Sequence, residues 1–237
     1  MIDEAIILAG GFGTRLRTVV ADVPKPMAPV KNRPFLEYIL VYLKKYDIKK
    51  IILSTGFKHE IIYKYFGEKY QGLDIIYSFE NEPLGTGGAI QQALLKSSDK
   101  DVLILNGDSL FKIDLRELIN FHLEQSTFTL ALKKVNEVSR FGHVEIDVNS
   151  HILRFCEKGE ISGSGLINAG VYIFNKNMFE QLSLPVKFSI EKHFFQQFYK
   201  FLNFRGLVCE GYFVDIGVPD SYVRAQKELT MQSDCNI

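Results

Sequence analysis

The chain has 237 residues, of which 46% are hydrophobic and 24% charged, and its 28 Lys and Arg residues balance 28 Asp and Glu residues. This length is enough to bury a sizeable core, and the neutral charge argues against nucleic-acid binding, which usually needs a basic excess. The three cysteines are far apart, the start is not basic, and no apolar run reaches about 18 residues, so we expect a cytoplasmic protein without disulfides, leader or membrane segment.

Strands and helices alternate through the first half. A continuous apolar run at residues 5–9 indicates a strand buried on both faces of a sheet. Further strands are predicted at 51–53, 75–77 and 102–105, and helices at 35–43, 60–66, 89–95 and 115–123. This alternation is typical of βαβ units and of a parallel sheet with helices on both faces.

The second half contains more short strands and fewer helices. Strands are predicted at 128–132, 143–146, 153–156, 167–174 and 212–214, with helices after Ser189 and from Pro219 to near Leu229. No linker-like composition separates the halves. We therefore expect one domain over residues 1–237, built on a Rossmann-like, mixed and mostly parallel sheet in three α/β/α layers.

A glycine-rich turn follows the first predicted strand, with the sequence Leu8-Ala9-Gly10-Gly11-Phe12-Gly13-Thr14-Arg15. Backbone N–H groups that no side chain shields can converge there on an anion. The turn lacks the lysine of a Walker loop and the third glycine of a dinucleotide fingerprint. We interpret it as a phosphate-binding loop; the alternative is a plain tight turn.

Two cations accompany this turn. Arg15 ends it, and Lys25 stands between Pro24 and Pro26, whose rings fix φ and remove donors. We expect a rigid, extended segment that presents the lysine at a defined place. A glycine-rich loop, an arginine and a fixed lysine suit a triphosphate, while a solvated surface lysine is the alternative.

Two acidic residues occupy similar settings far apart in the sequence. Asp108 follows the buried strand 102–105, at the edge of the sheet where ligands of open α/β folds bind. Asp215 follows the strand 212–214 and precedes a glycine after one residue. Mg²⁺ prefers a few protein oxygens together with substrate phosphates, so both are candidate ligands. For Asp108, capping of the next turn is the alternative.

Other features carry less information. The segment 80–88 joins a strand to a helix, and its glycines would let a flat group such as a nucleobase lie against the backbone; a flexible start of a helix is the alternative. The five histidines lack ligand spacing. Cys156 and the aromatic residues between 194 and 201 are expected to pack in the core.

A series of short motifs occurs in one order, and together they resemble the sugar-1-phosphate nucleotidylyltransferases. The motifs are Gly-Gly-x-Gly-Thr-Arg at 10–15, Pro-Lys-Pro at 24–26, Pro-Leu-Gly-Thr at 83–86, Asn-Gly-Asp at 106–108, Glu-Lys at 157–158, Asn-Ala-Gly at 168–170 and Asp-Ile-Gly at 215–217. The resemblance implies a GT-A-like fold. It implies an enzyme that converts a nucleoside triphosphate and a sugar 1-phosphate into a nucleotide-sugar and pyrophosphate. It also implies a nucleotide-binding half of about 1–125 and a sugar-binding half of about 126–230.

The resemblance further implies a role for each motif. The nucleotide would be bound by Leu8, Gly10, Gly11, Gly13, Thr14, Glu80, Gly85 and Thr86. Arg15 and Lys25 would be catalytic, Asp108 and Asp215 would hold Mg²⁺, and the sugar phosphate would be bound by Gly142, Glu157, Lys158 and Asn168. No protein nucleophile is required, because the sugar phosphate is itself an anionic nucleophile.

The base and the sugar are indicated by finer details. Guanine presents N1–H and N2–H₂ side by side, which the carboxylate of Glu80 can accept together, so GTP is the expected donor. The amino-acid sequence at 15–20, 26–29, 33–38 and 85–90 most resembles that of D-glycero-D-manno-heptose 1-phosphate guanylyltransferases. Open alternatives are another hexose 1-phosphate, mannose included, a glycosyltransferase, or a non-catalytic subunit that senses nucleotide-sugar. The sequence is compatible with a homo-oligomer.

Overall fold

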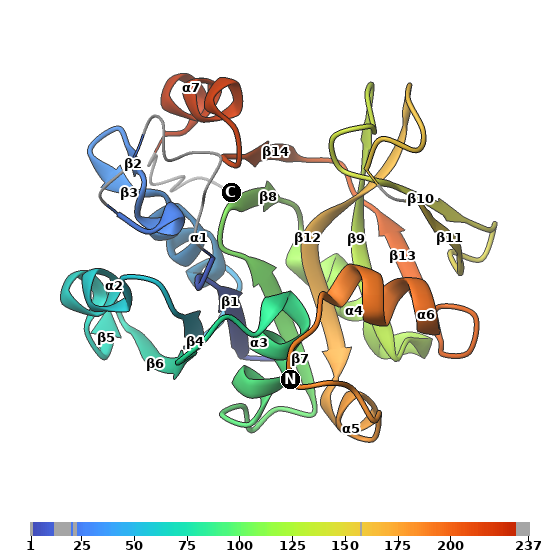
Figure 1. The fold of residues 1–237 in the computed structure, drawn as a ribbon, viewed down its shortest axis with the longest axis horizontal. Helices are drawn as coiled ribbons and strands as arrows, with labels where there is room; N and C mark the ends of the chain where they lie inside the picture. Colours follow the sequence, from blue (N-terminus) through green and yellow to red (C-terminus); the bar gives the residue numbers. More distant parts are fainter. Residues whose placement is uncertain (1, 12–19, 21–22, 157, 231–237) are drawn as a thin grey trace.

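The computed structural model describes residues 2–11, 20, 23–156 and 158–230 of the chain (Figure 1). Most of its strands join one mixed sheet of order β11-β10-β12-β7-β1-β4-β6-β5, with β9 paired to β12 and β13 paired to β9. The strands of this sheet are β1 (Glu4–Leu8), β4 (Lys50–Thr55), β5 (Lys69–Tyr70), β6 (Leu73–Phe79), β7 (Asp101–Asn106), β9 (Phe128–Val135), β10 (His143–Ile146), β11 (Ile152–Cys156), β12 (Gly165–Asn175) and β13 (Phe204–Val208).

The centre of the sheet is parallel and is covered on both faces. The strands β7, β1, β4 and β6 run in one direction, and along β1 the side chain of Ile7 enters one hydrophobic core while that of Ile6 enters the other. A strand that lies between two hydrophobic cores has no polar face. This accounts for the uninterrupted apolar run at residues 5–9, most of which lies in β1.

Helices cover each core in turn. The first core is covered by α1 (Phe35–Lys44), α2 (His59–Phe66), α4 (Leu115–Gln125) and α7 (Pro219–Glu228). The second is covered by α3 (Gly85–Leu94), α5 (Lys176–Glu180) and a π-helical turn at Glu191–Phe195 that α6 (Gln196–Phe198) continues. The structure therefore confirms the predicted fold class, a mixed sheet between helical layers.

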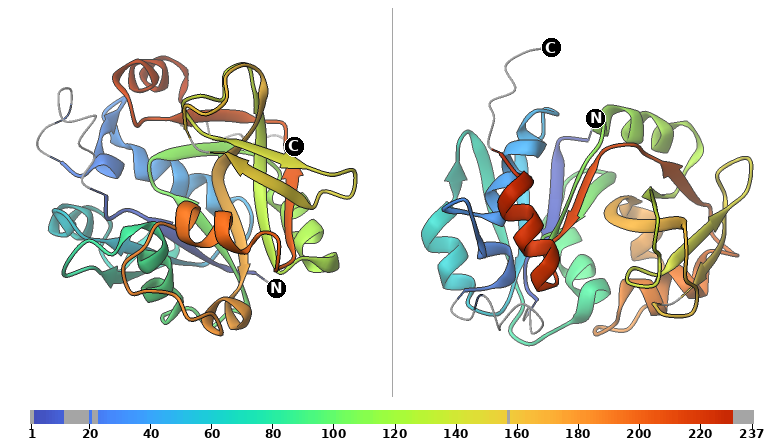
Figure 2. Two further views of the ribbon diagram at one scale, coloured as in Figure 1. Left: turned by 45° about the vertical axis from the view of Figure 1, so that its right-hand side comes forward. Right: turned by 90° about the horizontal axis from the view of Figure 1, so that it is seen from above.

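The strand β12 joins the parallel centre to an antiparallel second half. Its 11 residues pair with β7, β9 and β10, all antiparallel, and the second half extends to the right of the parallel centre in Figure 1. The chain then returns to the first half. There α7 lies on the hairpin of β2 (Pro29–Val30) and β3 (Arg33–Pro34), and Tyr222 and Gln226 donate hydrogen bonds to the Pro29 carbonyl (Figure 2).

A separate two-stranded sheet matters for the site. In it β8 (Ser109–Lys112) pairs antiparallel with β14 (Tyr212–Asp215), so that Asp215 lies opposite Ser109. The sequence predicted β14 but not β8, which follows β7 after only a two-residue turn. β8 lies so close behind β7 that the sequence shows no separate strand there, and β14 supplies its pairing partner.

Some expectations from the sequence are corrected by the structure. The helix predicted at 89–95 begins at Gly85, so its glycines form the first helical turn. Lys25 does not lie in an extended segment: it starts the 3₁₀ turn Lys25–Met27, in which the Met27 N–H donates to the Pro24 carbonyl at 2.7 Å. Phe201 is 81% exposed rather than in the core, because α6 ends before it. In the described part of the chain, no helix combines the length and apolar character needed to cross a membrane.

A buried acid ties the start of the sheet to the turn before β7. Glu4 is almost fully buried, and its carboxylate accepts hydrogen bonds from Lys50 Nζ at 2.5 Å, from Ser97 Oγ at 2.5 Å and from Ser98. Burial alone would raise the pKa of Glu4, but these donors outweigh it and lower that pKa to about 2.

We expect this depressed pKa to stabilise the fold above pH 4.5 and the stabilisation to be lost as the pH falls from 4.5 towards 2. A difference of this size corresponds to about 3 kcal/mol at neutral pH. Urea unfolding from pH 7 to pH 3 should show Glu4→Gln less stable than the wild type at pH 7, with the gap closing at low pH. The exposed Glu124→Gln is the control, and a gap independent of pH would contradict the assignment.

Candidate active site

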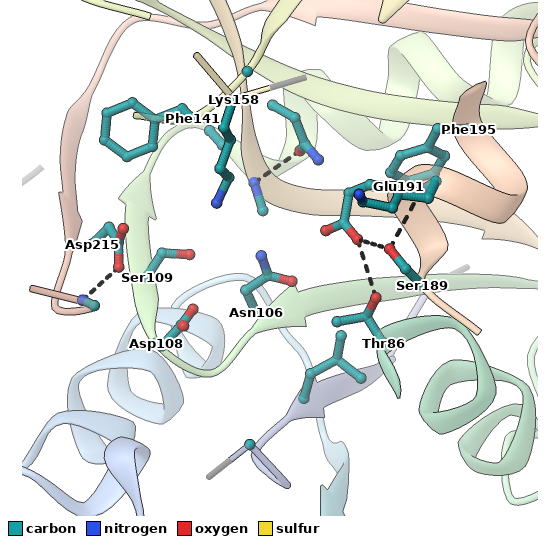
Figure 3. Close-up of a pocket in the computed structure, with 18 of the residues that line it drawn as sticks. Thr86, Asn106, Asp108, Ser109, Phe141, Lys158, Ser189, Glu191, Phe195 and Asp215 are labelled. Atoms are coloured by element: carbon teal, nitrogen blue, oxygen red, sulfur yellow. Dashed lines mark hydrogen bonds between the residues drawn. The ribbon is translucent and has the colours of Figure 1, made fainter. Parts of the chain in front are cut away.

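A pocket of about 990 Å³ opens at the carboxyl ends of the parallel strands β1 and β7, and both halves of the chain line it. Figure 3 shows Asp108 and Asp215 on one side, Thr86 and Glu191 on the other, and Lys158 reaching into the space between them. This is the edge at which ligands bind in open α/β sheets.

Every described candidate from the sequence lines this pocket. Those residues are Leu8, Gly10, Gly11, Lys25, Glu80, Gly85, Thr86, Asp108, Gly142, Lys158, Asn168 and Asp215. The remaining candidates, Gly13, Thr14, Arg15 and Glu157, lie outside the described residues. The structure thus brings together residues from distant motifs, while the role of each remains a prediction.

The two acidic candidates are neighbours through the small sheet. Asp108 ends the turn after β7, Asp215 ends β14, and the Ile216 N–H donates to the Asp108 carbonyl at 2.9 Å. Lys25 Nζ lies 2.5 Å from Asp108 Oδ2 and 3.9 Å from Asp215 Oδ1. Two acids that the sequence separates widely therefore share one cation.

The electrostatics of this pair suit a divalent ion. Burial raises the pKa of the Asp215 carboxyl above its ordinary value, and the negative charge of Asp108 raises it further, while Lys25 opposes both. Among the described residues, no group of three or more His, Cys, Asp or Glu side chains gathers to hold a metal. Two carboxylates with room for phosphate oxygens match the donor set that Mg²⁺ prefers, so Asp108 and Asp215 fit such an ion.

Glu80 is held in a fixed orientation at the end of β6. Its Oε1 accepts a hydrogen bond from Ser54 Oγ at 3.1 Å, and its Oε2 accepts one from the Leu84 N–H at 3.1 Å. The carboxylate crosses closely over Gly10, where a Cβ would lie 2.4 Å from Oε1. A side chain at position 10 would therefore push the Glu80 carboxylate out of this orientation, so Gly10 supports the placement of Glu80.

The glycines at the start of α3 make room for the chain itself. A Cβ on Gly87 would lie 2.1 Å from the Phe188 ring, and one on Gly88 would lie 2.2 Å from the Val186 carbonyl oxygen. The backbone of residue 188 is also hydrogen-bonded on both sides, to Leu84 and to Gly87, each at 2.9 Å. The expectation that glycines here leave a flat surface for a nucleobase is therefore wrong for Gly87 and Gly88, whose open faces are covered by residues 186–188.

A polar cluster fastens the same two segments at the rim of the pocket. Glu191 Oε2 accepts hydrogen bonds from Thr86 Oγ1 at 3.1 Å and from Ser189 Oγ at 2.9 Å, and the Ile190 N–H donates to Thr86 Oγ1 at 2.9 Å (Figure 3). The sequence analysis placed a helix after Ser189, which the serine is suited to cap, and did not single out Glu191. A signal was available in an acid two residues after a capping serine, but nothing in the sequence shows that it meets Thr86.

Asn168 is oriented by a break in β12. The pairing register of β12 with β9 shifts between Asn168 and Tyr172, and Gly170 there has φ +77°, which favours glycine. Asn168 Oδ1 accepts from the Gly170 N–H at 3.0 Å, and its Nδ2 donates to the Tyr172 hydroxyl at 2.9 Å. The amide keeps one N–H and one lone pair for a ligand in the pocket.

Arg140 and Phe141 line the pocket without having been predicted. The Arg140 guanidinium lies 5.2 Å from the centre of the Phe141 ring and donates to Ser221 Oγ on α7 at 3.3 Å. Both precede Gly142, whose φ of +82° turns the chain into β10. A cation and an aromatic residue beside a glycine were the available signal, but no motif placed them near Asp215.

The sequence model of the family described as "Nucleotidyl transferase" matches residues 4–232 of the chain. The chain is 52% identical over 227 residues to the D-glycero-alpha-D-manno-heptose 1-phosphate guanylyltransferase of Aneurinibacillus thermoaerophilus, covering 95% of this chain and 98% of the relative. It is 46% identical to the protein of the same name from Campylobacter jejuni, covering 92% of this chain and 96% of that relative.

Solved structures give the same picture. The fold is similar to that of HddC from Yersinia pseudotuberculosis, with a TM-score of 0.86 and 36% identity over 96% of this chain and 99% of that chain. HddC complexed with GMP-PN is similar at a TM-score of 0.85, with the same identity and coverage.

The close approach of residues 186–188 to α3 predicts the effect of adding a single methyl group. Because the backbone carbonyl of Val186 cannot rotate away as a side chain can, Gly88→Ala should lower the free energy of unfolding by about 1–3 kcal/mol. Gln91→Ala on the same helix is the control, expected within about 0.5 kcal/mol of the wild type. Equal stability of Gly88→Ala and the wild type in urea would contradict the packing described.

Proposed function

The chain belongs to the nucleotidyl transferase family, and we propose that it transfers GMP from GTP to D-glycero-α-D-manno-heptose 1-phosphate, releasing pyrophosphate. The observation that carries the proposal is the convergence of base-facing, phosphate-facing and sugar-facing candidates on one pocket. The relatives named for this reaction, similar over nearly their whole length, support the choice of base and sugar.

In the proposed reaction a phosphate oxygen of the sugar 1-phosphate attacks the α-phosphorus of GTP. The new P–O bond forms as the bond to the β-phosphate breaks, and pyrophosphate leaves with the electron pair. The nucleophile is already ionised at neutral pH, so the protein's task is to align the two phosphates and to neutralise their charge. Lys25, which lines the pocket, is proposed to neutralise part of that charge, and Arg15 is proposed to act with it from the glycine-rich turn.

Glu80 supports guanine through the lone pairs that it has left. Each carboxylate oxygen already accepts one hydrogen bond, from Ser54 or from Leu84, and each can accept another. Guanine offers N1–H and N2–H₂ side by side, so both remaining acceptors can be used at once. Uracil and thymine offer one N–H between two carbonyl oxygens, and a carboxylate would face those oxygens with like partial charge.

The sugar phosphate is proposed to lie against the second half. Asn168 offers an N–H and a lone pair to a hydroxyl, and Lys158 points into the pocket, where its ammonium group suits the phosphate (Figure 3). Gly142 lines the same wall, and Glu157 is proposed as a further hydroxyl ligand. We propose that the chain works as one domain in the cytoplasm, with nucleotide bound by about residues 1–125 and sugar by about 126–230.

Nucleotidyltransferases generally use a divalent metal, and we propose Mg²⁺ held by Asp108 and Asp215. When bound, the ion withdraws negative charge from the phosphates of the nucleotide. The two carboxylates would hold it at the wall of the pocket, where the pairing of β8 with β14 keeps them together.

The proposed activity is tested by measuring pyrophosphate release for GTP, UTP, dTTP, CTP and ATP, each with heptose, mannose and glucose 1-phosphates. We expect GTP with the heptose 1-phosphate to give the highest kcat/KM. A preference for UTP or dTTP would contradict the base assignment, and a preference for another sugar would contradict the sugar assignment. If no pair of substrates released pyrophosphate, the proposed activity would be contradicted and the non-catalytic, nucleotide-sugar-sensing subunit would be favoured.

The role of Glu80 is tested by replacing its carboxylate with an amide. Glu80→Gln loses one of the two acceptors that face guanine, so kcat/KM with GTP should fall about 10- to 100-fold while the ratio of UTP to GTP use rises. Glu82→Gln, an exposed change in the same loop, is the matched control and should leave both values unchanged. An unaltered nucleotide preference in Glu80→Gln would remove Glu80 from base recognition.

A further inference from the structure

The ammonium group of Lys25 stands between the two carboxylates that fit a metal. Its Nζ is 2.5 Å from Asp108 Oδ2 and 3.9 Å from Asp215 Oδ1, and its side chain is 14% exposed, against 40% for Asp108 and 26% for Asp215. Asp215 Oδ1 also accepts the Gly217 N–H at 2.6 Å. The lysine therefore approaches oxygen atoms on both acids that a divalent ion would use.

The chain is built to admit the lysine at this place. A Cβ on Gly217 would lie 2.9 Å from Lys25 Nζ and 2.7 Å from Asp215 Oδ1, so the glycine leaves room for the ion pair, which would have to shift beside a larger residue. The backbone of Lys25 is fixed by the 3₁₀ turn, in which the Ala28 N–H donates to the Lys25 carbonyl at 3.0 Å. Only the flexible four-carbon side chain has to move for Nζ to leave the carboxylates.

Electrostatic repulsion makes the Lys25 ammonium group and a divalent ion compete for Asp108 and Asp215. Two carboxylates at this spacing repel each other, and one cation between them removes most of that repulsion. A carboxylate that already neutralises the ammonium group binds a divalent ion more weakly, because the two cations repel each other at close range. The lysine and the metal therefore compete for the two carboxylates.

We propose that Lys25 excludes divalent ions from Asp108 and Asp215 in the nucleotide-free protein and releases the two carboxylates when a phosphate group draws its ammonium away. The proposal rests on the proposed function for the identity of that phosphate, which belongs to the incoming triphosphate. One lysine then holds the acids together before the nucleotide arrives and neutralises the nucleotide afterwards. Metal and nucleotide consequently bind together, each favouring the other.

The test measures metal binding with no nucleotide present. Mn²⁺ is titrated into nucleotide-free protein at pH 8, and free Mn²⁺ is followed by electron paramagnetic resonance. Lys25→Met keeps the length of the side chain and removes its charge, and we expect it to bind Mn²⁺ at least about 10-fold more tightly than the wild type. Lys25→Arg keeps the positive charge and should bind as weakly as the wild type.

Two controls assign the effect to this site. Lys187→Met removes an exposed lysine elsewhere and should leave Mn²⁺ binding at the wild-type level. Adding Asp215→Asn to Lys25→Met should abolish the gain, because one of the two carboxylates is lost. Circular dichroism of each variant establishes that it is folded, and Lys25→Gln replaces Lys25→Met if the methionine variant is not.

The proposal is overturned if the charge-removing variant binds Mn²⁺ no more tightly than the wild type, or if neither protein binds it. It is also overturned if Lys187→Met gives the same gain, since general charge would then be the cause. No nucleotide or sugar enters the titration. A different base or sugar preference would therefore contradict the proposed function and leave this result standing, and the reverse also holds.

Discussion

The structure depends on placing two negative charges side by side at the edge of a sheet. Asp108 lies at the end of a parallel strand, and Asp215 is brought to it by the pairing of β8 with β14. Like charges at close range repel, and a neighbouring cation reduces that repulsion; Lys25 supplies one from a turn fixed by backbone hydrogen bonds. The strand ends, the small sheet and Gly217 are all arranged around that pair of acids.

Close packing of the chain against glycines forms the opposite wall of the pocket. Gly87 and Gly88 admit residues 186–188 against α3, and Thr86 and Glu191 fasten the contact with hydrogen bonds. A segment of the second half is thereby held against a helix of the first at this wall. Glycines that look like a ligand surface in the sequence turn out to serve the approach of one backbone to another.

The sequence predicts the parallel centre well because its inner strands are continuous apolar runs, as at residues 5–9, and segments with helical periodicity separate them. The start of α3 at Gly85 was missed, since a run of glycines carries no helix signal. The sequence also indicates the members of the site, since short motifs lie at strand ends and in turns. It cannot indicate β8, whose four residues gain a partner only when β14 arrives from far along the chain. Nor can it indicate that Glu191 meets Thr86 or that Lys25 meets both acids, because those contacts depend on tertiary structure alone.

The pocket contains charged and polar groups that are already bonded to each other, and this determines what they can do next. Glu80 and Asn168 each use part of their hydrogen-bonding capacity within the protein, and both line the pocket with further donors or acceptors left over. A group held in this way loses little freedom when a ligand arrives, and it rejects a ligand whose donors do not match the remainder. Specificity for base and sugar would then arise from bonds within the protein as much as from bonds to the substrate. Lys25 would be the exception in the proposed reaction, because its contacts with the two acids would have to be exchanged before it could bind a phosphate.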